Sequence, residues 1–365
     1  MENNMKKLTL DQLDDLTIGS AILGSGGGGD PAYFYMMTKH LMEKLGPVSM
    51  IKSSELKPDD LVLPMGMIGA PLVETEKFPT GLEYISLIRD VENVTGKKVT
   101  VLMPCEAAGS NAFFPIMVAN QLGLPILDAD LMGRAFPEVQ MCSNRLLGLP
   151  SAPAFISDWR GNSVIINAQT PLTLEKIARQ ITISIGSWGV FADRPMSADE
   201  AEKYTIPKSM SRALSIGKVH REAKAAGTDP LEAVLTLCKG FWIGSGKITD
   251  IDRAISKGFQ KGNVVIQNKN DRMEICFQNE YLLAKCNGKI LATTPDIIML
   301  MEQETGEPIT SESLRFGLKV NLIALPSPSI WTTKQGLSVV GPRYFGYETD
   351  YLPIQKSKQK ALALT

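Results

Sequence analysis

The sequence has few of the residues that most often serve as catalytic bases or zinc ligands. Among its 365 residues are only two histidines, His40 and His220, and each falls within a predicted helix. A serine or cysteine triad would need one of them as its base, and no G-x-S-x-G nucleophile elbow occurs. We therefore interpret both histidines as surface or interhelical residues, which argues against a triad hydrolase.

Cysteine is also scarce. The sequence has an odd number of cysteines, five in total, and it has no C-x-x-C pair. They are scattered at Cys105, Cys142, Cys238, Cys276 and Cys286. This pattern argues against a disulfide framework and against a structural zinc site.

Neither charge nor long apolar runs indicate a nucleic acid or a membrane as a partner. With 38 basic and 39 acidic residues the net charge is −1, and no basic run marks a nucleic-acid surface. No apolar run is long enough to span a bilayer, and residues 1–15 turn acidic before the hydrophobic segment of a signal peptide can form. We expect a cytoplasmic protein that binds no nucleic acid and no membrane.

What the sequence does contain is a regular alternation of helices and strands in its first half. The predicted helices cover residues 9–23, 31–45, 80–95 and 111–123, and the predicted strands cover residues 60–65, 98–103 and 125–127. Strand, helix, strand, helix, strand at this spacing is typical of βαβ units, which form a mostly parallel sheet. The first half is therefore predicted to be an α/β domain.

Beyond residue 150 the pattern changes to short strands interrupted by helices. The predicted elements are a hairpin over 154–157 and 163–167, helices over 172–185, 208–226 and 230–239, and strands over 247–251, 263–267, 273–277, 281–285, 289–292 and 318–324. Many short strands at close spacing predict a barrel or a sandwich.

The two patterns together predict the domain organisation. We expect an N-terminal α/β domain at residues 1–167 and a C-terminal, mostly β domain with inserted helices at residues 168–354. The lysine-rich end, residues 355–365, is expected to be a disordered tail.

Three loops rich in glycine or acidic residues follow the predicted strands, at residues 66–71, 104–111 and 128–138. Ligands of open α/β sheets bind beyond the carboxyl ends of the strands, and in a parallel sheet these ends share one edge. We therefore expect the polar side chains of these loops to converge. They are Glu106, Asn111, Asp128, Asp130 and Glu138.

The third of these loops contains the most closely spaced charged residues. Asp128, Asp130, Arg134 and Glu138 lie within eleven residues of one another, directly after an apolar strand. This segment is either the wall of a site or an ordinary strand-to-helix connection whose acids cap the next helix. If a metal binds, Asp128 and Asp130 are its candidate ligands, and their oxygens suit Mg²⁺ or Mn²⁺ better than zinc. The alternative is metal-free acid–base chemistry by paired carboxyls.

A run of glycines at residues 24–29 formally matches G-x-G-x-x-G. Because a helix rather than a strand precedes it, we expect no nucleotide cofactor. The run is either a flexible joint between two helices or a ligand site. In the second case the backbone N–H groups of Gly26, Gly27 and Gly28, beside a helix N-terminus, would bind an anionic or amide-like substrate.

A further arginine, Arg343, lies among aromatic residues in the segment 341–347. Its guanidinium could hold a carboxylate of the substrate through two hydrogen bonds. It could equally stack on the neighbouring rings. The sequence leaves these two roles open.

Several motifs occur together in an order that resembles one family. They are Gly26-Gly27-Gly28-Gly29-Asp30-Pro31, Gly69-Ala70-Pro71, Glu106 with Gly109 and Asn111, Asp128-Ala129-Asp130 with Met132-Gly133-Arg134-Ala135-Phe136-Pro137-Glu138, Gln278-Asn279-Glu280, Pro295-Asp296 and Gly341-Pro342-Arg343. With them the chain resembles the S-methyl-thiohydantoin desulfurase-like family over nearly its whole length, to about residue 353. Two departures, Ala107-Ala108 and Cys142, bear on substrate preference rather than on fold.

The resemblance implies a three-layer α/β domain followed by a mostly β domain. It also implies loss of a sulfur substituent from a thiohydantoin to give a hydantoin, and a hydantoinase- or oxoprolinase-type protein as a partner. On this basis we expect Asp128 or Asp130 to be the base or metal ligand, with Mg, Mn or Zn as the metal. Glu138 or Glu106 would protonate the leaving thiol.

Arg134 and Asn111 would then hold the ring carbonyl as negative charge develops. Two other functions remain open: hydrolysis or isomerisation of a related lactam such as oxoproline, and a non-catalytic accessory role beside a hydantoinase-type partner. We also expect a homo-oligomer, because most soluble oligomers are symmetric assemblies of one chain.

Overall fold

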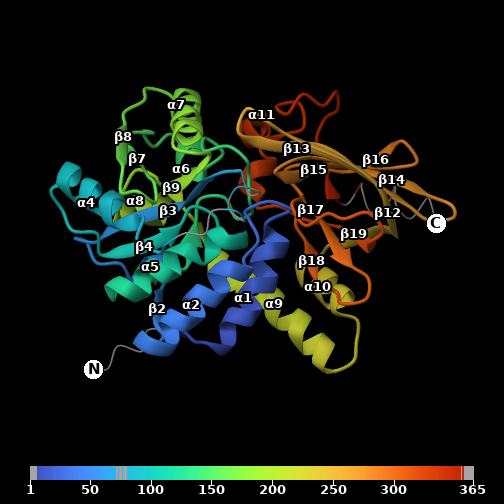
Figure 1. Cartoon of the computed structure of the whole chain (residues 1–365), viewed down its shortest axis with the longest axis horizontal. Helices are drawn as coiled ribbons and strands as arrows, with labels where there is room; N and C mark the ends of the chain where they lie inside the picture. Colours follow the sequence, from blue (N-terminus) through green and yellow to red (C-terminus); the bar gives the residue numbers. More distant parts are fainter. Residues whose placement is uncertain (1–5, 71–72, 74–75, 77–79, 355, 357–365) are drawn as a thin grey trace.

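The computed structural model describes residues 6–70, 73, 76, 80–354 and 356. Two large β-sheets lie side by side in it, and helices pack against both (Figure 1). The N-terminal half of the chain builds the sheet on the left of that view, and the C-terminal half builds the sheet on the right. The predicted order of an α/β domain followed by a mostly β domain is confirmed. The predicted tail, 355–365, lies outside the described residues except for Lys356.

The N-terminal sheet has a parallel centre and antiparallel flanks. Its strands are β1 (Lys6–Leu8), β2 (Val48–Ile51), β3 (Leu61–Gly69), β4 (Val101–Pro104), β5 (Ile126–Leu127), β7 (Ala154–Ser157), β8 (Ser163–Ile166), β9 (Trp188–Ala192) and β10 (Met196–Ser197). Their order is β1-β2-β5-β4-β3-β9-β7-β8, with β10 paired to β3. The strands β2, β5, β4 and β3 are parallel neighbours, as the alternation of helices and strands predicts.

Helices cover both faces of this sheet. They are α1 (Asp11–Leu23), α2 (Ala32–Leu45), α4 (Tyr84–Thr95), α5 (Phe114–Leu122), α6 (Ser143–Leu146), α7 (Pro171–Ser184) and α8 (Ala198–Tyr204), with the short 3₁₀ helices η1 (Ser53–Glu55) and η2 (Gly109–Ala112). Successive strand residues point to opposite faces, so Leu63 of β3 joins the apolar cluster of α4 and α5, whereas Val62 joins that of α6 and α8. The predicted three layers are confirmed.

The C-terminal sheet is antiparallel. Its strands are β12 (Phe241–Ser256), β13 (Phe259–Gln267), β14 (Arg272–Gln278), β15 (Glu280–Cys286), β16 (Lys289–Thr293), β17 (Ile297–Glu302), β18 (Pro308–Ile309) and β19 (Lys319–Leu325). Their order is β16-β15-β14-β13-β12-β19-β17-β18. Although β15 and β17 are far apart in this order, they lie in contact, because the sheet curls on itself into a barrel-like form.

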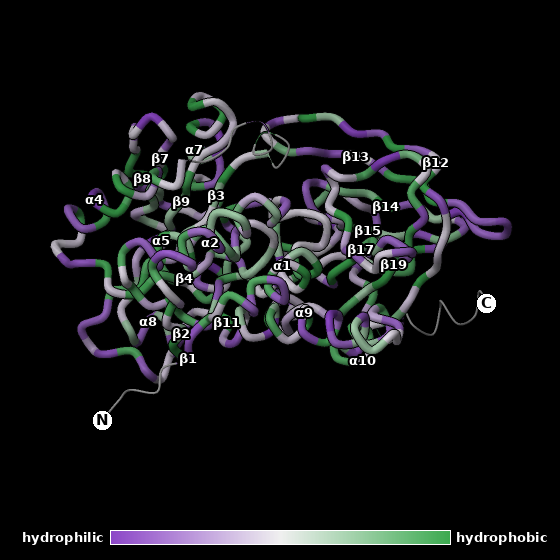
Figure 2. The backbone as a smooth tube through the Cα atoms, turned by 60° about the horizontal axis from the view of Figure 1, so that its bottom comes forward, coloured by the Kyte–Doolittle hydropathy of each residue, from purple (hydrophilic) through white to green (hydrophobic). Residues whose placement is uncertain are grey.

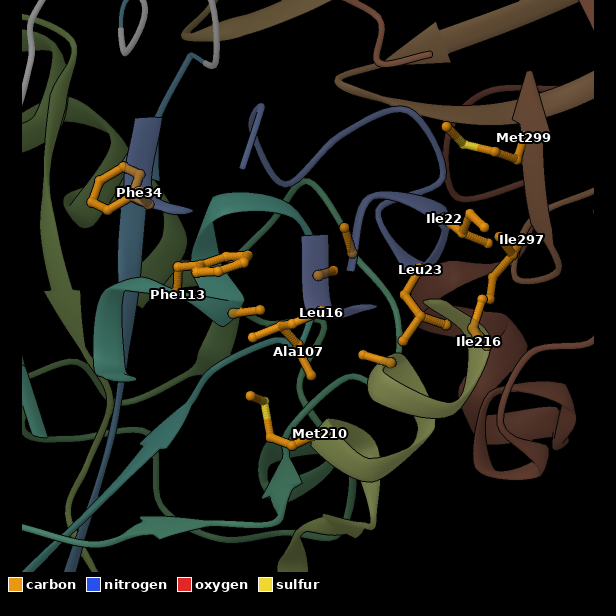
Figure 3. Packing of buried hydrophobic residues seen from close by; sticks show 14 of the residues in the cluster. Leu16, Ile22, Leu23, Phe34, Ala107, Phe113, Met210, Ile216, Ile297 and Met299 are labelled. Carbon is orange, nitrogen blue, oxygen red and sulfur yellow. The ribbon is translucent and has the colours of Figure 1, made fainter. Parts of the chain in front are cut away.

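The remaining elements join the two sheets. They are β6 (Ala129–Asp130), β11 (Ile206–Pro207), α9 (Ser209–Ala225), α10 (Pro230–Cys238), η3 (Ser329–Thr332) and α11 (Lys334–Val340). Helices α1 and α9 cross closely, since a Cβ on Gly19 would lie 1.8 Å from the Ala213 carbonyl oxygen. Residues of α1, α9 and β17 then share one apolar core with the N-terminal helices (Figure 3). The two halves are therefore packed through a continuous core.

Two features differ from the sequence-based expectation. Residues 66–69, predicted as a loop, continue strand β3, because β9 pairs with this stretch and satisfies its backbone groups. The strands β9 and β10 also lie beyond the predicted boundary at residue 167, yet they belong to the N-terminal sheet. The edge of that sheet therefore does not coincide with the predicted boundary, which as a division of the sequence stays a prediction.

The strands β12 and β13 form a long ribbon that leaves the C-terminal sheet. It reaches toward α7, which packs on the N-terminal sheet, in two different views (Figures 1 and 2). At its tip the ring of Phe259 lies 4.2 Å from the guanidinium carbon of Arg179 on α7. Much of the outer part of β12 is exposed, and hydrophilic and hydrophobic stretches alternate along the ribbon in Figure 2. The ribbon thus links the C-terminal sheet to a helix that packs on the N-terminal sheet.

Candidate active site

A cleft lies where the two domains meet. Its walls come from the glycine loop, from the end of β3, from the segment after β4, from the loop 136–139 and from the turn before β15. Most of the charged groups on these walls are carboxyls, namely Glu106, Glu138 and Glu280. The cleft is at the carboxyl edge of the parallel strands, where the sequence predicts it.

Glu106 follows β4 directly and is only 6% exposed. Its Oε1 accepts a hydrogen bond from Asn111 Nδ2 at 2.6 Å, and its Oε2 accepts a longer one from the backbone N–H of Phe136 at 3.3 Å. Burial raises the pKa of this carboxyl to about 8, although both donors oppose the shift. Glu106 therefore exchanges protons near neutral pH.

Glu280 reaches the same cleft from the other domain. The preceding residue, Asn279, has φ 56°, which turns the chain sharply between β14 and β15. Glu280 is 2% exposed, and its Oε2 has no hydrogen-bond partner among the described residues. Burial, and next the charge of Glu106, raise the pKa of Glu280 well above its usual range. The two carboxyls thus influence each other across the domain boundary.

Arg134 lies behind the cleft wall and is fully buried. Its Nη1 donates to the carbonyls of Pro295 and Asp296 at 2.8 and 2.7 Å, and its guanidinium packs over the ring of Phe136. Burial lowers the pKa of Arg134 to about 10, and the charge of Glu280 opposes this shift. The predicted contact of Arg134 with substrate is not favoured by this position, but its charge does act on Glu280.

Asn111 is on the cleft wall, where it holds Glu106. Its Oδ1 accepts the backbone N–H of Met67 at 2.7 Å, which fixes the orientation of the amide. Because Nδ2 then faces Glu106 Oε1, the side chain connects β3 to the carboxyl. Asn111 is therefore placed as predicted, but its contacts serve Glu106.

Glu138 faces the cleft and is held by neutral donors from three segments. The hydroxyl of Tyr344 donates to its Oε2 at 2.6 Å, Gln140 Nε2 also donates to Oε2, and Gln278 Nε2 donates to Oε1 at 3.4 Å. Tyr344 and Gln278 belong to the C-terminal domain. Glu138 is therefore held by contacts that cross between the domains.

Asp128 and Asp130 are not on the cleft wall. Asp128 accepts hydrogen bonds from the backbone N–H and the hydroxyl of Ser211, at 2.8 and 2.6 Å, in the first turn of α9. Asp130 accepts four: from the N–H groups of Ala107, Met132 and Gly133 and from the hydroxyl of Ser209. These contacts correspond to the alternative in which the acids support the loop and cap a helix. The predicted catalytic roles of the two residues stay predictions.

The same contacts bear on the predicted metal. The oxygens of Asp128 and Asp130 already accept hydrogen bonds from the protein, which occupy lone pairs that an ion would need. Within the described part of the chain, no three side chains of His, Cys, Asp or Glu are arranged as metal ligands. These residues do not fit the metal that the sequence suggests.

The glycine loop divides into two parts. Gly28 and Gly29 line the cleft just ahead of α2, whereas Gly26 packs on the ring of Tyr281 and Gly27 on Glu280. A Cβ on Gly27 would lie 2.1 Å from Glu280 Oε1, so only glycine leaves room for this carboxyl. Of the three predicted substrate-binding glycines, Gly28 is thus the one on the cleft wall.

Arg343 lies away from the cleft. Its side chain is 67% exposed and pairs with Asp350 at 2.6 Å, which also raises the pKa of the guanidinium. Its neighbour Tyr344, rather than Arg343, sends its hydroxyl to the site through Glu138. The structure therefore does not favour the predicted clamp on a substrate carboxylate.

Sequence reasoning did not select Glu280 or Arg179 as site residues, although both line the cleft, as does Cys105. Glu280 stands in the quoted motif Gln278-Asn279-Glu280, and the turn at Asn279 was the available signal. Arg179 lies in a helix with no visible motif. Burial raises the pKa of the Cys105 thiol well above its usual range, which disfavours the thiolate form.

Comparison with known proteins gives a consistent result. A family model described as the S-Me-THD-like N-terminal domain matches residues 11–168, and one described as the S-Me-THD-like C-terminal domain matches residues 169–354. No curated protein matches the chain significantly. A protein from Chromobacterium violaceum, solved by X-ray crystallography, shares the fold with a TM-score of 0.79 at 23% identity, over 96% of this chain and all of that one. The search for helices able to cross a membrane found none among the described residues.

Proposed function

The chain belongs to the S-Me-THD-like family, and from this premise we propose that it is a hydrolase that removes the sulfur substituent from an S-methyl-thiohydantoin ring. The observation that carries the proposal is the pair of buried carboxyls, Glu106 and Glu280, which face one cleft from two domains. Paired carboxyls whose environments push their pKa values apart supply an acid and a base at one pH.

The two environments assign the roles. Glu106 accepts two hydrogen bonds, which favour its ionised form and hold its pKa at about 8, below that of Glu280, so Glu106 ionises first and is the base. Glu280 is more strongly deprived of water and has an oxygen without a partner, so it carries the proton and is the acid. When Glu280 gives up its proton, the new carboxylate forms beside the charge of Arg134, which stabilises it.

The reaction consumes one water. Its oxygen bonds to the ring carbon that carries sulfur, one of its protons passes to Glu106, and Glu280 protonates the adjacent ring nitrogen. The carbon–sulfur bond then breaks, the hydroxyl becomes the ring carbonyl, and sulfur leaves with a proton as methanethiol. Overall, the S-methyl-thiohydantoin and water give the hydantoin and methanethiol, and the two carboxyls return to their starting protonation states through solvent.

The walls of the cleft suit a neutral ring with amide edges. A protonated carboxyl donates to a ring carbonyl or nitrogen, and a carboxylate accepts from a ring N–H. The backbone of Gly28 and Gly29 lies on the cleft wall ahead of the 14-residue helix α2, whose N-terminus favours nearby negative charge. Glu138 adds a fixed acceptor on the cleft wall.

The test is to follow methanethiol release from an S-methyl-thiohydantoin by the purified protein. We expect release in the wild type and a loss of roughly 10²–10⁴-fold in kcat in Glu106→Gln and in Glu280→Gln, as for removal of a general acid or base. Glu304→Gln, at an exposed carboxylate paired with Lys319, is the matched control and should keep full activity.

Three further arms test the rival functions and the metal. Ring opening of hydantoin or oxoproline without thiol release would identify a lactam hydrolase instead. Loss of methanethiol release on addition of a chelator, and its recovery on addition of Mg²⁺, Mn²⁺ or Zn²⁺, would show that the reaction requires a metal. Tight binding of hydantoin with no turnover of any ring would identify an accessory subunit, and a hydantoinase-type partner would then be sought.

A further inference from the structure

We propose that Glu175 and Arg179 of α7 are positioning residues, which fix Glu138 in the cleft by binding the backbone on both sides of it. The inference rests on the proposed function, because it assigns Glu138 a part in binding the ring. Neither residue contacts the acid–base pair Glu106 and Glu280 through any hydrogen bond.

The first support is the set of bonds between α7 and the loop. Glu175 Oε2 accepts the backbone N–H of Val139 at 2.8 Å, and Arg179 Nη2 donates to the carbonyl of Pro137 at 3.1 Å. These two backbone groups belong to the residues immediately before and after Glu138. Since both bonds come from consecutive turns of one helix, they hold the loop at two points and set the direction of the side chain between them.

The second support is that the pair is itself well fixed. Glu175 Oε1 and Arg179 Nε form an ion pair at 2.8 Å, with side chains only 9% and 7% exposed. Burying two charges costs free energy unless each is paired and hydrogen-bonded. Here each group has its ionic partner and one backbone partner of the loop, so loss of either residue leaves a buried charge and a free backbone group.

The third support comes from the C-terminal domain. The ring of Phe259, at the tip of the β12–β13 ribbon, covers the Arg179 guanidinium at 4.2 Å. Gly258 allows this approach, since a Cβ there would lie 2.8 Å from Arg179 Cδ. The ribbon therefore shields the ion pair from water and strengthens it. The contacts of Glu175 and Arg179 with the loop around Glu138 are therefore complete only when Phe259 of the ribbon is in place.

The experiment compares Arg179→Gln, Arg179→Lys and Glu175→Gln with the wild type. Displacing a binding group by about 1 Å can cost roughly 10²-fold in rate. We therefore expect a loss of this size in kcat/KM in Arg179→Gln, with the pH profile unchanged because Glu106 and Glu280 are intact. Arg179→Lys keeps the positive charge and should recover part of the loss, and Lys176→Gln, one residue beyond Glu175 on α7, is the control.

A second readout does not depend on activity. Hydrogen exchange of the Val139 amide reports the bond to Glu175 directly. Faster exchange at Val139 in Arg179→Gln and Glu175→Gln, with unchanged exchange in the strands β3 and β4, is the expected result. Unchanged exchange at Val139, or a shifted pH profile, would overturn the positioning role. The wild type could release no methanethiol while exchange at Val139 is still faster in the two variants. The proposed function would then be wrong, but the positioning of the loop by Glu175 and Arg179 would hold.

Discussion

The residues of the site differ chiefly in how many donors each carboxyl receives. Asp130 accepts four hydrogen bonds and Glu106 two, while one oxygen of Glu280 has no partner among the described residues. A carboxylate saturated by the protein supports structure, and one with free oxygens can exchange protons. Sequence shows that Asp128, Asp130 and Glu138 are clustered, but it does not show which neighbours will donate to each.

Gly27 gives a first prediction at this scale. Because a Cβ at this position would lie 2.1 Å from Glu280 Oε1, Gly27→Ala must displace the carboxyl. We expect a loss of roughly 10²-fold in kcat, the cost of a misplaced catalytic group. Kinetics and thermal unfolding are measured together. Shortening the acid in the double variant Gly27→Ala/Glu280→Asp should recover part of the loss, and full activity in Gly27→Ala would contradict the tight contact.

Asp128 decides between the two interpretations of its loop. If it caps α9 through Ser211, Asp128→Asn loses one acceptor and should destabilise the fold by about 1 kcal/mol, the usual cost of a lost cap. Turnover should stay within about twofold, since variants away from the reacting groups change little. Denaturant unfolding and methanethiol release test both points. An inactive but stable Asp128→Asn protein would restore the catalytic role that its sequence position suggests.

At the scale of elements, sequence-based prediction succeeded where an element depends on local contacts and failed where it depends on residues far away in the sequence. Helices α1 and α2 and the parallel strands β3, β4 and β5 follow from local periodicity. β9 does not, because residues 188–192 become a strand by pairing with β3 across more than a hundred residues of sequence. The cleft edge was predictable from strand ends, whereas the contribution of Glu280 required knowing that β15 meets the glycine loop.

At the scale of elements, we predict that the tip of the β12–β13 ribbon contributes more to stability than its exposed side. Phe259 is 8% exposed at its tip, and Ile255 on the same ribbon is 53% exposed. Phe259→Ala should destabilise the protein by about 3 kcal/mol, as for a buried aromatic ring, and should lower turnover by loosening Arg179. Ile255→Ala should change stability by less than about 0.5 kcal/mol. Equal effects of the two substitutions would show that the tip does not act through α7.

For the whole molecule, the site is a property of the domain interface. Glu106 comes from the N-terminal sheet and Glu280 from the C-terminal sheet, and the glycine loop and α1 pack between them. Backbone bonds fix this arrangement: Tyr281 N–H donates to the Ser25 carbonyl at 2.6 Å, and Ser311 N–H donates to the Gly26 carbonyl at 2.7 Å. Neither domain alone contains the acid–base pair, so both must fold against each other before chemistry is possible. Whether copies of the chain also associate stays a prediction.

Carboxyls buried near the domain interface make the stability of the fold depend on pH. Burial raises the pKa of Glu106 from 4.5 to about 8 and that of Asp130 from 3.8 to about 6. At a pH between the ordinary pKa and the raised pKa of each group, the folded state binds more protons than the unfolded state. Stability therefore falls as pH rises through each of these two ranges. The Glu106 contribution is complete below pH 4.5 and is lost as pH passes about 8.

We therefore expect the melting temperature to decline steadily between pH 4.5 and about 8, and the decline to be shallower in Glu106→Gln, whose amide cannot titrate. Scanning calorimetry at constant ionic strength measures both curves. Paired surface carboxylates act in the opposite direction, but groups such as Glu200 have a lowered pKa, so their effect is confined to pH values below this window. A melting temperature that rises through the window would mean that Glu106 keeps an ordinary pKa in the folded protein, and the assignment of a base that ionises only near pH 8 would be wrong.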